Sequence, residues 1–300
     1  MVDSTTAQAR QGDLPIVVAV DGSATSYHAV AWAAVDAAVH RCRLHIVTSI
    51  AIRPGFVFGR EPGEDDMEWM REDGERALTE AARVARTATA GEALAISTEL
   101  ILEPIVPHLI DHSRQARTLA VGSRGLGAFR RELLGSVGAA LTRHAHCPVA
   151  VVHSTSATDA VSSSKPVLVG VDGTDNSVSA IEVAFEEASR RKVGLIALHA
   201  WSDMTGIDLP LLDWDIVQEQ EDILLAENLA GFGERYPDVS VRRVLVRDRP
   251  VRSLLEESEN AQLLVVGSHG RGGFTGMLLG STSAALLHSV ECPLIVVRAR

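Results

Sequence analysis

Short apolar runs alternate with longer amphipathic segments along the whole chain. In the first half the apolar runs are rich in β-branched residues; they are Ile16–Val20, Leu44–Ile50, Leu119–Val121 and Val149–Val152. Strands that are apolar on both faces are typical of a parallel sheet covered by helices on each side. The intervening segments Ser26–Arg41 and Glu68–Ala90 have the spacing or the composition of helices.

The second half repeats this alternation, with predicted helices at Ser177–Lys192 and Asp215–Arg235. Alternating strands and helices predict an α/β fold with a doubly wound parallel sheet. Such sheets bind ligands at the carboxyl ends of their strands, near the point where the strand order reverses. Asp21, Gly122 and their counterparts in the second half end predicted strands, so we expect them to converge on one edge of the sheet.

An internal repeat relates the two halves. PIVVAVDGS at Pro15–Ser23 reappears as PVLVGVDGT at Pro166–Thr174, an offset of 151 residues. LAVGSRG and LVVGSHG, further along each half, are separated by 145 residues. The first half therefore contains six more residues, which we place after its second strand, where a peripheral connection tolerates added length.

The repeat predicts two domains, residues 1–157 and 158–300. The small, polar stretch Ser154–Ser164 lies between them and has the composition of a flexible linker. Exposed sheet edges tend to be paired or covered. We therefore expect the last strands of the two copies, Val149–Val152 and Leu294–Val297, to pack against each other as a pseudo-dimer.

Composition restricts the classes of protein to consider. The formal net charge is −11, and 46% of the residues are hydrophobic. An acidic surface repels nucleic-acid backbones, so we expect no nucleic-acid partner. The chain contains no apolar run of about eighteen residues, and its first residues lack the pattern of a signal peptide. We expect a cytoplasmic protein without membrane insertion, whose three cysteines are reduced and mostly buried.

A set of glycines recurs with one spacing in both halves. The matched positions are Gly122, Gly125, Gly135 and Ser136 in the first half, and Gly267, Gly270, Gly280 and Ser281 in the second. Glycine at a strand exit lets backbone N–H groups approach an anion, and Gly-Ser at a helix start adds a hydroxyl and the positive end of the helix dipole. A lone glycine-rich turn needs no ligand, but the duplicated spacing predicts a polyphosphate cradle. The lysine of a P-loop and the G-x-G-x-x-G fingerprint are both missing.

The pattern G-x2-G-x9-G-[ST], preceded by a strand that ends in V-D-G-[ST], resembles the ATP-binding pattern of the universal stress protein family. Because the pattern occurs twice, the chain is similar to the tandem, two-domain members of actinobacteria. The resemblance covers Pro15 to Val297. It implies two Rossmann-like domains, each with a five-stranded parallel sheet, and one ATP per domain, accompanied by Mg²⁺ or Mn²⁺. It also implies a homodimer and a regulatory role that involves an unidentified protein partner.

The resemblance assigns ligand contacts to matching positions. Contacts to the adenosine end are implied for Ala19, Asp21, Ser49 and Gly122, and for Gly170, Asp172, Ala200 and Gly267. Contacts to the phosphates are implied for Gly125, Gly135, Ser136 and Val137, and for Gly270, Gly280, Ser281 and Thr282. Gly127 and Gly272 would keep the intervening loop open. Arg124, His269 and Arg271 either add positive charge to the phosphates or point to solvent.

Other polar residues receive structural interpretations. Several histidines lie close in sequence without the spacing of a metal site, so we expect them at helix ends or on the surface: His108, His112, His144, His146 and His153. The acidic groups 64–66 and 219–222 are expected at solvated helix starts. Cys147 and Cys292 each precede the proline that opens a last strand, where a small buried thiol is expected.

Two functions remain open. In one, the protein is an ATP-binding sensor whose occupancy changes the surface that it offers to a partner. In the other, it is a slow ATP hydrolase or phosphotransferase in which Asp21 or Asp172 positions metal or water. Efficient phosphoryl transfer needs a positioned base and strong positive charge at the γ-phosphate. Neither half shows a second carboxylate motif or a loop lysine, so the sequence favours the sensor and we assign no catalytic residue.

Overall fold

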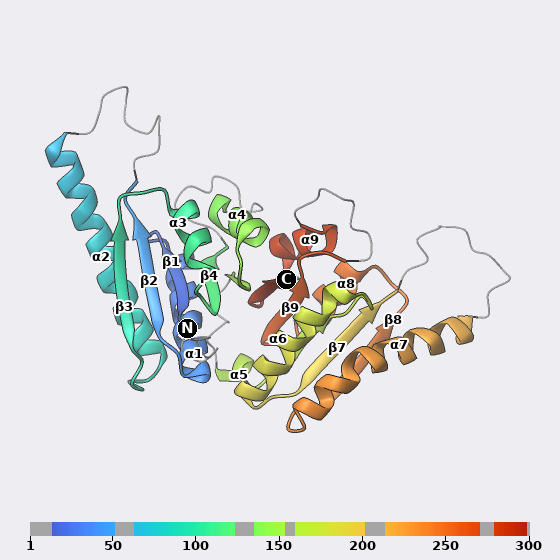
Figure 1. Ribbon diagram of the computed structural model, residues 1–300. Coiled ribbons are helices and arrows are strands. Elements are labelled where there is room, and N and C mark those ends of the chain that lie inside the picture. The colour runs from blue at the N-terminus through green and yellow to red at the C-terminus, as the bar shows by residue number, and fades with distance from the viewer. Residues whose placement is uncertain are drawn as a thin grey trace, which may run out of the picture.

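The computed structural model describes residues 14–51, 63–123, 135–153, 160–201, 214–270 and 279–298, in which strands and helices alternate (Figure 1). The strands are β1 (Ile16–Val20), β2 (Leu44–Ser49), β3 (Ile96–Ile101), β4 (Thr118–Gly122), β5 (Val149–Val152), β6 (Val167–Gly170), β7 (Leu195–Ala200), β8 (Val241–Val246), β9 (Leu263–Gly267) and β10 (Leu294–Val297). The helices are α1 (Ala24–His40), α2 (Glu64–Ala88), α3 (Ile105–His112), α4 (Ser136–His144), α5 (Ala160–Ser163), α6 (Asp175–Arg191), α7 (Trp214–Arg235), α8 (Pro250–Ser258) and α9 (Ser281–Ser289).

These strands form one continuous sheet in the order β3-β2-β1-β4-β5-β10-β9-β6-β7-β8. Neighbouring strands within each half are parallel, and β1 lies between β2 and β4, as in a doubly wound fold. The second half repeats this arrangement with β6 between β7 and β9. β5 and β10 pair antiparallel, with Ile295 opposite Ala150. The prediction that the two halves join through their last strands is therefore confirmed.

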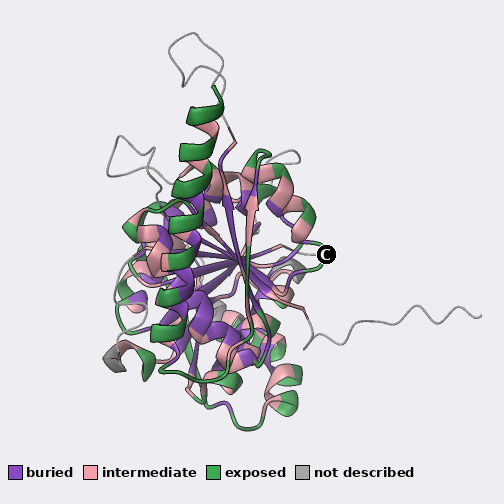
Figure 2. Cartoon of the chain, turned by 90° about the vertical axis from the view of Figure 1, so that its left-hand side faces the viewer, coloured by how far each residue is buried: buried purple, intermediate pink, exposed green. Residues whose placement is uncertain are grey.

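Helices cover both faces of the sheet. One buried cluster packs α1, α2, α6 and α7 against the strands, with Leu78 of α2 and Leu225 of α7 among its members. The other cluster packs α3, α4, α8 and α9 against the opposite face, with Leu109 of α3 and Leu286 of α9 among its members. Figure 2 shows buried strands between helices whose outer sides are exposed. The molecule is a three-layer α/β/α sandwich, as the apolar runs predicted.

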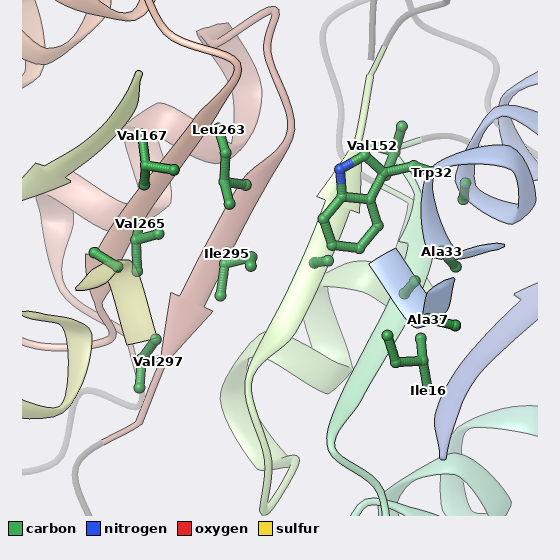
Figure 3. Packing of buried hydrophobic residues seen from close by; sticks show 14 of the residues in the cluster. Ile16, Trp32, Ala33, Ala37, Val152, Val167, Leu263, Val265, Ile295 and Val297 are labelled. Carbon is green, nitrogen blue, oxygen red and sulfur yellow. The ribbon is translucent and has the colours of Figure 1, made fainter. Parts of the chain in front are cut away.

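The hydrophobic core is continuous across the junction between the halves. Figure 3 shows Trp32 and Val152 of the first half in the same cluster as Val265 and Ile295 of the second. Trp32 is only 2% exposed. Since apolar area removed from water contributes about 25 cal/mol per Å², a shared core of this kind stabilises the two halves as one body.

Buried charges also cross the junction, between α1 and α6. The Arg191 guanidinium binds Asp36 and donates to Glu187 Oε2 over 2.9 Å, and His40 Nε2 lies 2.8 Å from Glu187 Oε1. The Arg191 guanidinium also lies 5.7 Å from the centroid of the Trp32 ring. Burial raises the pKa of Asp36 to about 6, and the nearby Glu187 carboxylate adds to this effect. Burial would also raise the pKa of Glu187, but His40 and Arg191 hold it below its usual value.

Two local expectations need correction. The predicted linker is partly helical, because α5 occupies 160–163 and Gln262 Nε2 donates to the carbonyl of Ser163 over 2.8 Å; residues 154–159 lie outside the described ranges. The acidic group 64–66 does open α2, as expected. The group 219–222 does not open a helix, because α7 begins at Trp214. Glu221 of that group instead lies 2.9 Å from Nε2 of the buried His199 on β7.

Candidate functional site

Asp21 follows β1 in a tight turn that leads directly into α1. Gly22 has a φ of +81°, a value that glycine adopts without strain. The backbone N–H of Ser23 donates to Asp21 Oδ1 over 3.1 Å, and Ser23 Oγ accepts from the N–H of Ser26 over 3.2 Å. The start of α1 is therefore capped by its own chain. The Asp21 side chain is exposed at the carboxyl edge of the sheet, where the sequence placed it.

Asp172 occupies the equivalent place after β6, with Gly173 at a φ of +73°. Both the backbone N–H and the hydroxyl of Thr174 donate to Asp172 Oδ1, over 2.9 and 2.7 Å. The Thr174 hydroxyl therefore orients the carboxylate instead of capping α6. Both donors bind Oδ1. The other oxygen, Oδ2, faces Gly270, which follows the end of β9.

Gly270 lies against Asp172 in the second half. A Cβ added at Gly270 would lie 2.8 Å from Asp172 Oδ2. A Cβ added at Gly280 would lie 3.4 Å from the Cα of His269 and 3.7 Å from the nitrogen of Gly270. His269 Nδ1 lies 3.0 Å from the hydroxyl of Ser268. Folding thus brings together four residues that the sequence assigned to one site: Asp172, His269, Gly270 and Gly280.

The second glycine of each pattern directly precedes a helix. The N–H of Gly135 donates to the carbonyl of Ser123 over 2.8 Å, and the N–H of Gly280 donates to that of Ser268 over 2.7 Å. These bonds hold the starts of α4 and α9 beside the ends of β4 and β9. Neither helix has a capping side chain. The first N–H groups of a helix lack intrahelical partners, so both starts offer donors and a positive dipole to an anion.

The residues that open these helices lie at the surface. Ser136 and Ser281, the first residues of α4 and α9, are exposed, and the Thr282 that follows Ser281 is half-buried. Val137 is half-buried and packs against the core. Two hydroxyls are therefore accessible beside the first N–H groups, whereas Val137 contributes packing through its side chain and only its backbone to the predicted cradle.

Gly122 has a packing role that the sequence did not predict. A Cβ at this last residue of β4 would lie 2.8 Å from the carbonyl carbon and oxygen of Thr25, and 3.0 Å from the nitrogen of Ser26. These are backbone atoms of the first turn of α1. Because no side chain can yield at this contact, glycine is required for the close packing of α1 on β4, whatever a ligand does there.

The remaining positions at the strand ends differ in what their side chains do. The hydroxyl of Ser49 donates to the carbonyl of Glu103 over 2.6 Å, so it ties the end of β2 to the chain after β3. Ala200 is the equivalent last residue of β7, and Gly267 is the last residue of β9. A Cβ at Gly170 would lie 3.2 Å from Leu254 Cδ1, and Ala19 packs against the same face of the sheet. These two positions therefore offer a ligand only their backbone.

Five predicted positions lie outside the residues that the structure describes: Arg124, Gly125, Gly127, Arg271 and Gly272. The cysteines are free thiols; Cys42 and Cys147 are buried, whereas Cys292, which was also expected to be buried, is half-buried. Burial raises the pKa of the Cys292 thiol to about 12, so this thiol is protonated at neutral pH, in agreement with a packing role. Within the described ranges, no helix is both long and apolar enough to cross a bilayer.

The sheet order and the strand-end glycines, present twice in one chain, define a class of protein: two Rossmann-like α/β units in tandem. The family model described as "Universal stress protein family" matches residues 14–153 and again 163–298. A universal stress protein of Mycobacterium tuberculosis is 47% identical over 288 residues, which cover 94% of this chain and 96% of that protein. A second universal stress protein from the same organism is 41% identical over 289 residues, which cover 95% and 96% of the two chains.

Among solved structures, a universal stress protein from Archaeoglobus fulgidus aligns with a TM-score of 0.68 at 21% identity. The alignment covers 95% of this chain and 98% of that one. This likeness extends the shared fold over both halves. The chain belongs to the universal stress protein family.

Proposed function

We propose that each half of this universal stress protein binds one ATP, accompanied by Mg²⁺ or Mn²⁺, and that occupancy regulates a protein partner in stress response or growth control. The observation that carries the proposal is the pair of uncapped helix starts, α4 and α9, each tied by a glycine N–H to the end of the neighbouring strand. The α1 start is capped by Ser23, so it has less to offer an anion. The starts of α3, α6 and α8 also lack a side-chain cap, but they do not follow the duplicated glycine pattern.

The acidic residues support a sugar site beside the phosphate site. In the second half, Asp172 lies beside Gly270, one residue after the half-buried His269. A carboxylate repels phosphates but accepts hydrogen bonds from hydroxyls, so Asp172 and its counterpart Asp21 suit a sugar. The helix starts attract phosphates. A carboxylate close to a helix start supports a nucleotide whose sugar and phosphates meet neighbouring groups at the carboxyl ends of the strands.

The proposal assigns one site to each predicted domain, residues 1–157 and 158–300. The backbone of Ala19, Ser49 and Gly122 would meet the adenosine in the first site, and that of Gly170, Ala200 and Gly267 in the second. The phosphates would meet the starts of α4 and α9, together with the glycine loops that precede them.

The proposal extends to a cytoplasmic location and to a homodimer. Since β5 and β10 already pair within the chain, a homodimer must form through another surface. Size-exclusion chromatography with light scattering, with and without ATP, tests the assembly: a mass of one chain at all concentrations would contradict the dimer.

The first test is to denature the purified, untreated protein and to identify the released small molecules by chromatography and mass spectrometry. We expect ATP at about two molecules per chain, one for each helix start. Recovery of ADP instead would favour the slow hydrolase over the sensor. If nothing is released and added ATP is not taken up, both glycine loops are structural.

A charge reversal tests the site itself. Gly270→Glu places a second carboxylate beside Asp172, so we expect the second site to lose ATP while the first site keeps it. Gly231→Glu is the matched control, because a Cβ at this exposed position in α7 has no neighbour within 4 Å. Isothermal titration should show about half the wild-type stoichiometry for Gly270→Glu and the full value for the control. Equal stoichiometry in both variants would remove the phosphate assignment.

A further inference from the structure

Four side chains with metal-binding atoms meet on the α3 face of the first half. His45 Nε2 lies 2.8 Å from Glu99 Oε2, and His108 Nε2 lies 3.5 Å from Glu99 Oε1. The rings of His108 and His112, one turn apart on α3, stack with their centroids 4.3 Å apart. The strand register explains the meeting, because β2 and β3 pair His45 with Ser97 and Val47 with Glu99, which puts His45 and Glu99 on one face.

We propose that His45, Glu99 and His112, with His108 as a fourth ligand, bind one divalent transition-metal ion of the zinc class. One ligand atom from each of His45, Glu99 and His112 lies within 4.8 Å of the other two. A tetrahedral zinc ion with bonds of about 2.0–2.1 Å holds its ligand atoms about 3.3–3.4 Å apart, so small rotations of these side chains would close the site. Three imidazoles and one carboxylate are the donors that suit zinc, cobalt, nickel or copper.

The surroundings of His45 orient it as a ligand. His45 Nδ1 lies 2.9 Å from the hydroxyl of Ser97, a partner that fixes the ring and directs Nε2 toward Glu99. The hydrogen bond between His45 Nε2 and the Glu99 carboxylate contains one proton. A divalent ion can replace this proton and bind both atoms. On α3, the buried Nε2 of His108 has no hydrogen-bond partner among the described residues.

The cluster shifts the pKa values of two of its members. Burial and the neighbouring His108 lower the pKa of His112. Partial burial would raise the pKa of Glu99, but the hydrogen bond from His45 and the electrostatic effect of the neighbouring histidines lower it below its usual value.

The second half offers an internal comparison. The repeat places Arg242 where the first half has Ser97, and Glu257 where it has His112. Arg242 and Glu257 form an ion pair that ties β8 to α8. The counterparts of His45 and Glu99 are Ile196 and Val244, which are not metal ligands. A metal ion in the first half would therefore tie the edge strand β3 to α3, as the Arg242 guanidinium ties β8 to α8.

A second cluster with similar donors is already neutralised. Asp36, His40 and Glu187 also bring their ligand atoms together. However, the Arg191 guanidinium binds both carboxylates there, so a cation already occupies the position that a metal would take. None of the cations described around Glu99 is a guanidinium or an ammonium group; its ion-pair partners are His45 and His108.

The test uses the full chain without a purification tag, freed of metal with a chelator and of nucleotide. Zn²⁺ and Co²⁺ are added separately and measured by elemental analysis after dialysis. We expect one ion per chain, and for Co²⁺ the visible absorption of a four-coordinate site. Because no nucleotide is added, this result is independent of the proposed ATP sites.

Variants locate the ion. His112→Gln and Glu99→Gln should each weaken Zn²⁺ binding by more than about tenfold, and Ser97→Ala, which removes the hydroxyl beside His45 Nδ1, by about tenfold. The double variant H144Q/H146Q removes two exposed histidines outside the cluster and should bind like the wild type. Circular dichroism checks the fold of each variant. If His112→Gln does not fold, the result for Glu99→Gln decides the test. Uptake that is absent in the wild type, or retained in both His112→Gln and Glu99→Gln, would overturn the proposal.

Discussion

Gly122 shows how one residue can carry a packing constraint that looks like a ligand motif in the sequence. The glycine belongs to the duplicated pattern, and the sequence assigns it to the adenosine end. In the folded chain it lies against the backbone of Thr25 and Ser26, where α1 crosses the end of β4. Gly122 therefore serves the contact between α1 and β4. The lack of a Cβ is required by this packing alone, with or without a bound ligand.

Gly122→Ala should destabilise the protein because the new Cβ meets backbone atoms 2.8 Å away. We expect the free energy of unfolding to fall by about 1–3 kcal/mol, the usual cost of overpacking a well-packed site. Urea unfolding followed by circular dichroism measures the change. A variant as stable as the wild type would show that α1 shifts without cost.

At the scale of elements, the corresponding helices that differ most in length between the halves are α2 and α7. α2 has 25 residues and α7 has 22, so part of the extra length in the first half lies in this helix, within the predicted region. α7 also contains Gly231 and Gly233 near its end, where glycine costs backbone entropy. The outer helix of the second half is therefore intrinsically weaker at its carboxyl end.

Gly231→Ala should stabilise α7. A Cβ at this exposed helical position has no atom within 4 Å, so it adds helix propensity without a clash. We expect a gain of about 0.5–1 kcal/mol in the free energy of unfolding. Glycine-to-alanine substitution should therefore raise the free energy of unfolding at Gly231 and lower it at Gly122. The two variants are measured together in urea, and each is the control for the other. A loss of stability would mean that Gly231 makes a contact that the folded chain does not show.

At the scale of the whole molecule, the junction between the halves combines an antiparallel strand pair, a shared apolar core and buried charges. His40 faces Asp36 on its own helix and Glu187 on α6, and Arg117 also acts on it. The Arg191 guanidinium binds both of these carboxylates. Burial alone would lower the pKa of His40, but the Glu187 carboxylate and its hydrogen bond raise it above 6.5. The folded junction therefore binds a proton on His40 more tightly than the unfolded chain does.

The junction should weaken as the pH rises. Since the pKa of His40 is higher in the folded state, its contribution to stability is complete below about pH 6.5 and is lost as the pH rises through the raised pKa. The raised pKa of Asp36 also makes stability fall as the pH rises, but at lower pH, between the usual pKa of an aspartate and about 6. We expect urea midpoints to fall from about pH 6.5 to pH 9 in the wild type.

A matched pair of variants isolates this effect. His40→Gln should lose the part of the pH dependence that His40 causes, whereas His144→Gln, at an exposed position, should keep the wild-type slope. If the slope of the His40→Gln variant equals that of the wild type, the proton on His40 does not stabilise the junction.

Local patterns predicted several elements close to their observed bounds, whereas no range was predicted for β3, α3, β8 and α8. β1 and β5 have the bounds that the apolar runs predicted, because a strand buried on both faces is visible as a continuous apolar run. α1 begins two residues earlier than expected, since Ser23 caps it. α5 was not predicted, because its four residues have no periodicity and are held by Gln262, from a distant part of the chain.

The amino-acid sequence by itself determined the alternation of strands and helices, the duplication, the spacing of the glycines and the pairing of the last strands. The first three depend on local composition and on a repeat that is read directly along the chain, and the pairing was expected because exposed sheet edges tend to be covered. Only the tertiary structure decided which side chains meet. His45 and Glu99 are 54 residues apart, and His40 and Glu187 are 147 apart. Their contacts depend on strand register and on how helices dock, and these are set by packing across the whole sheet.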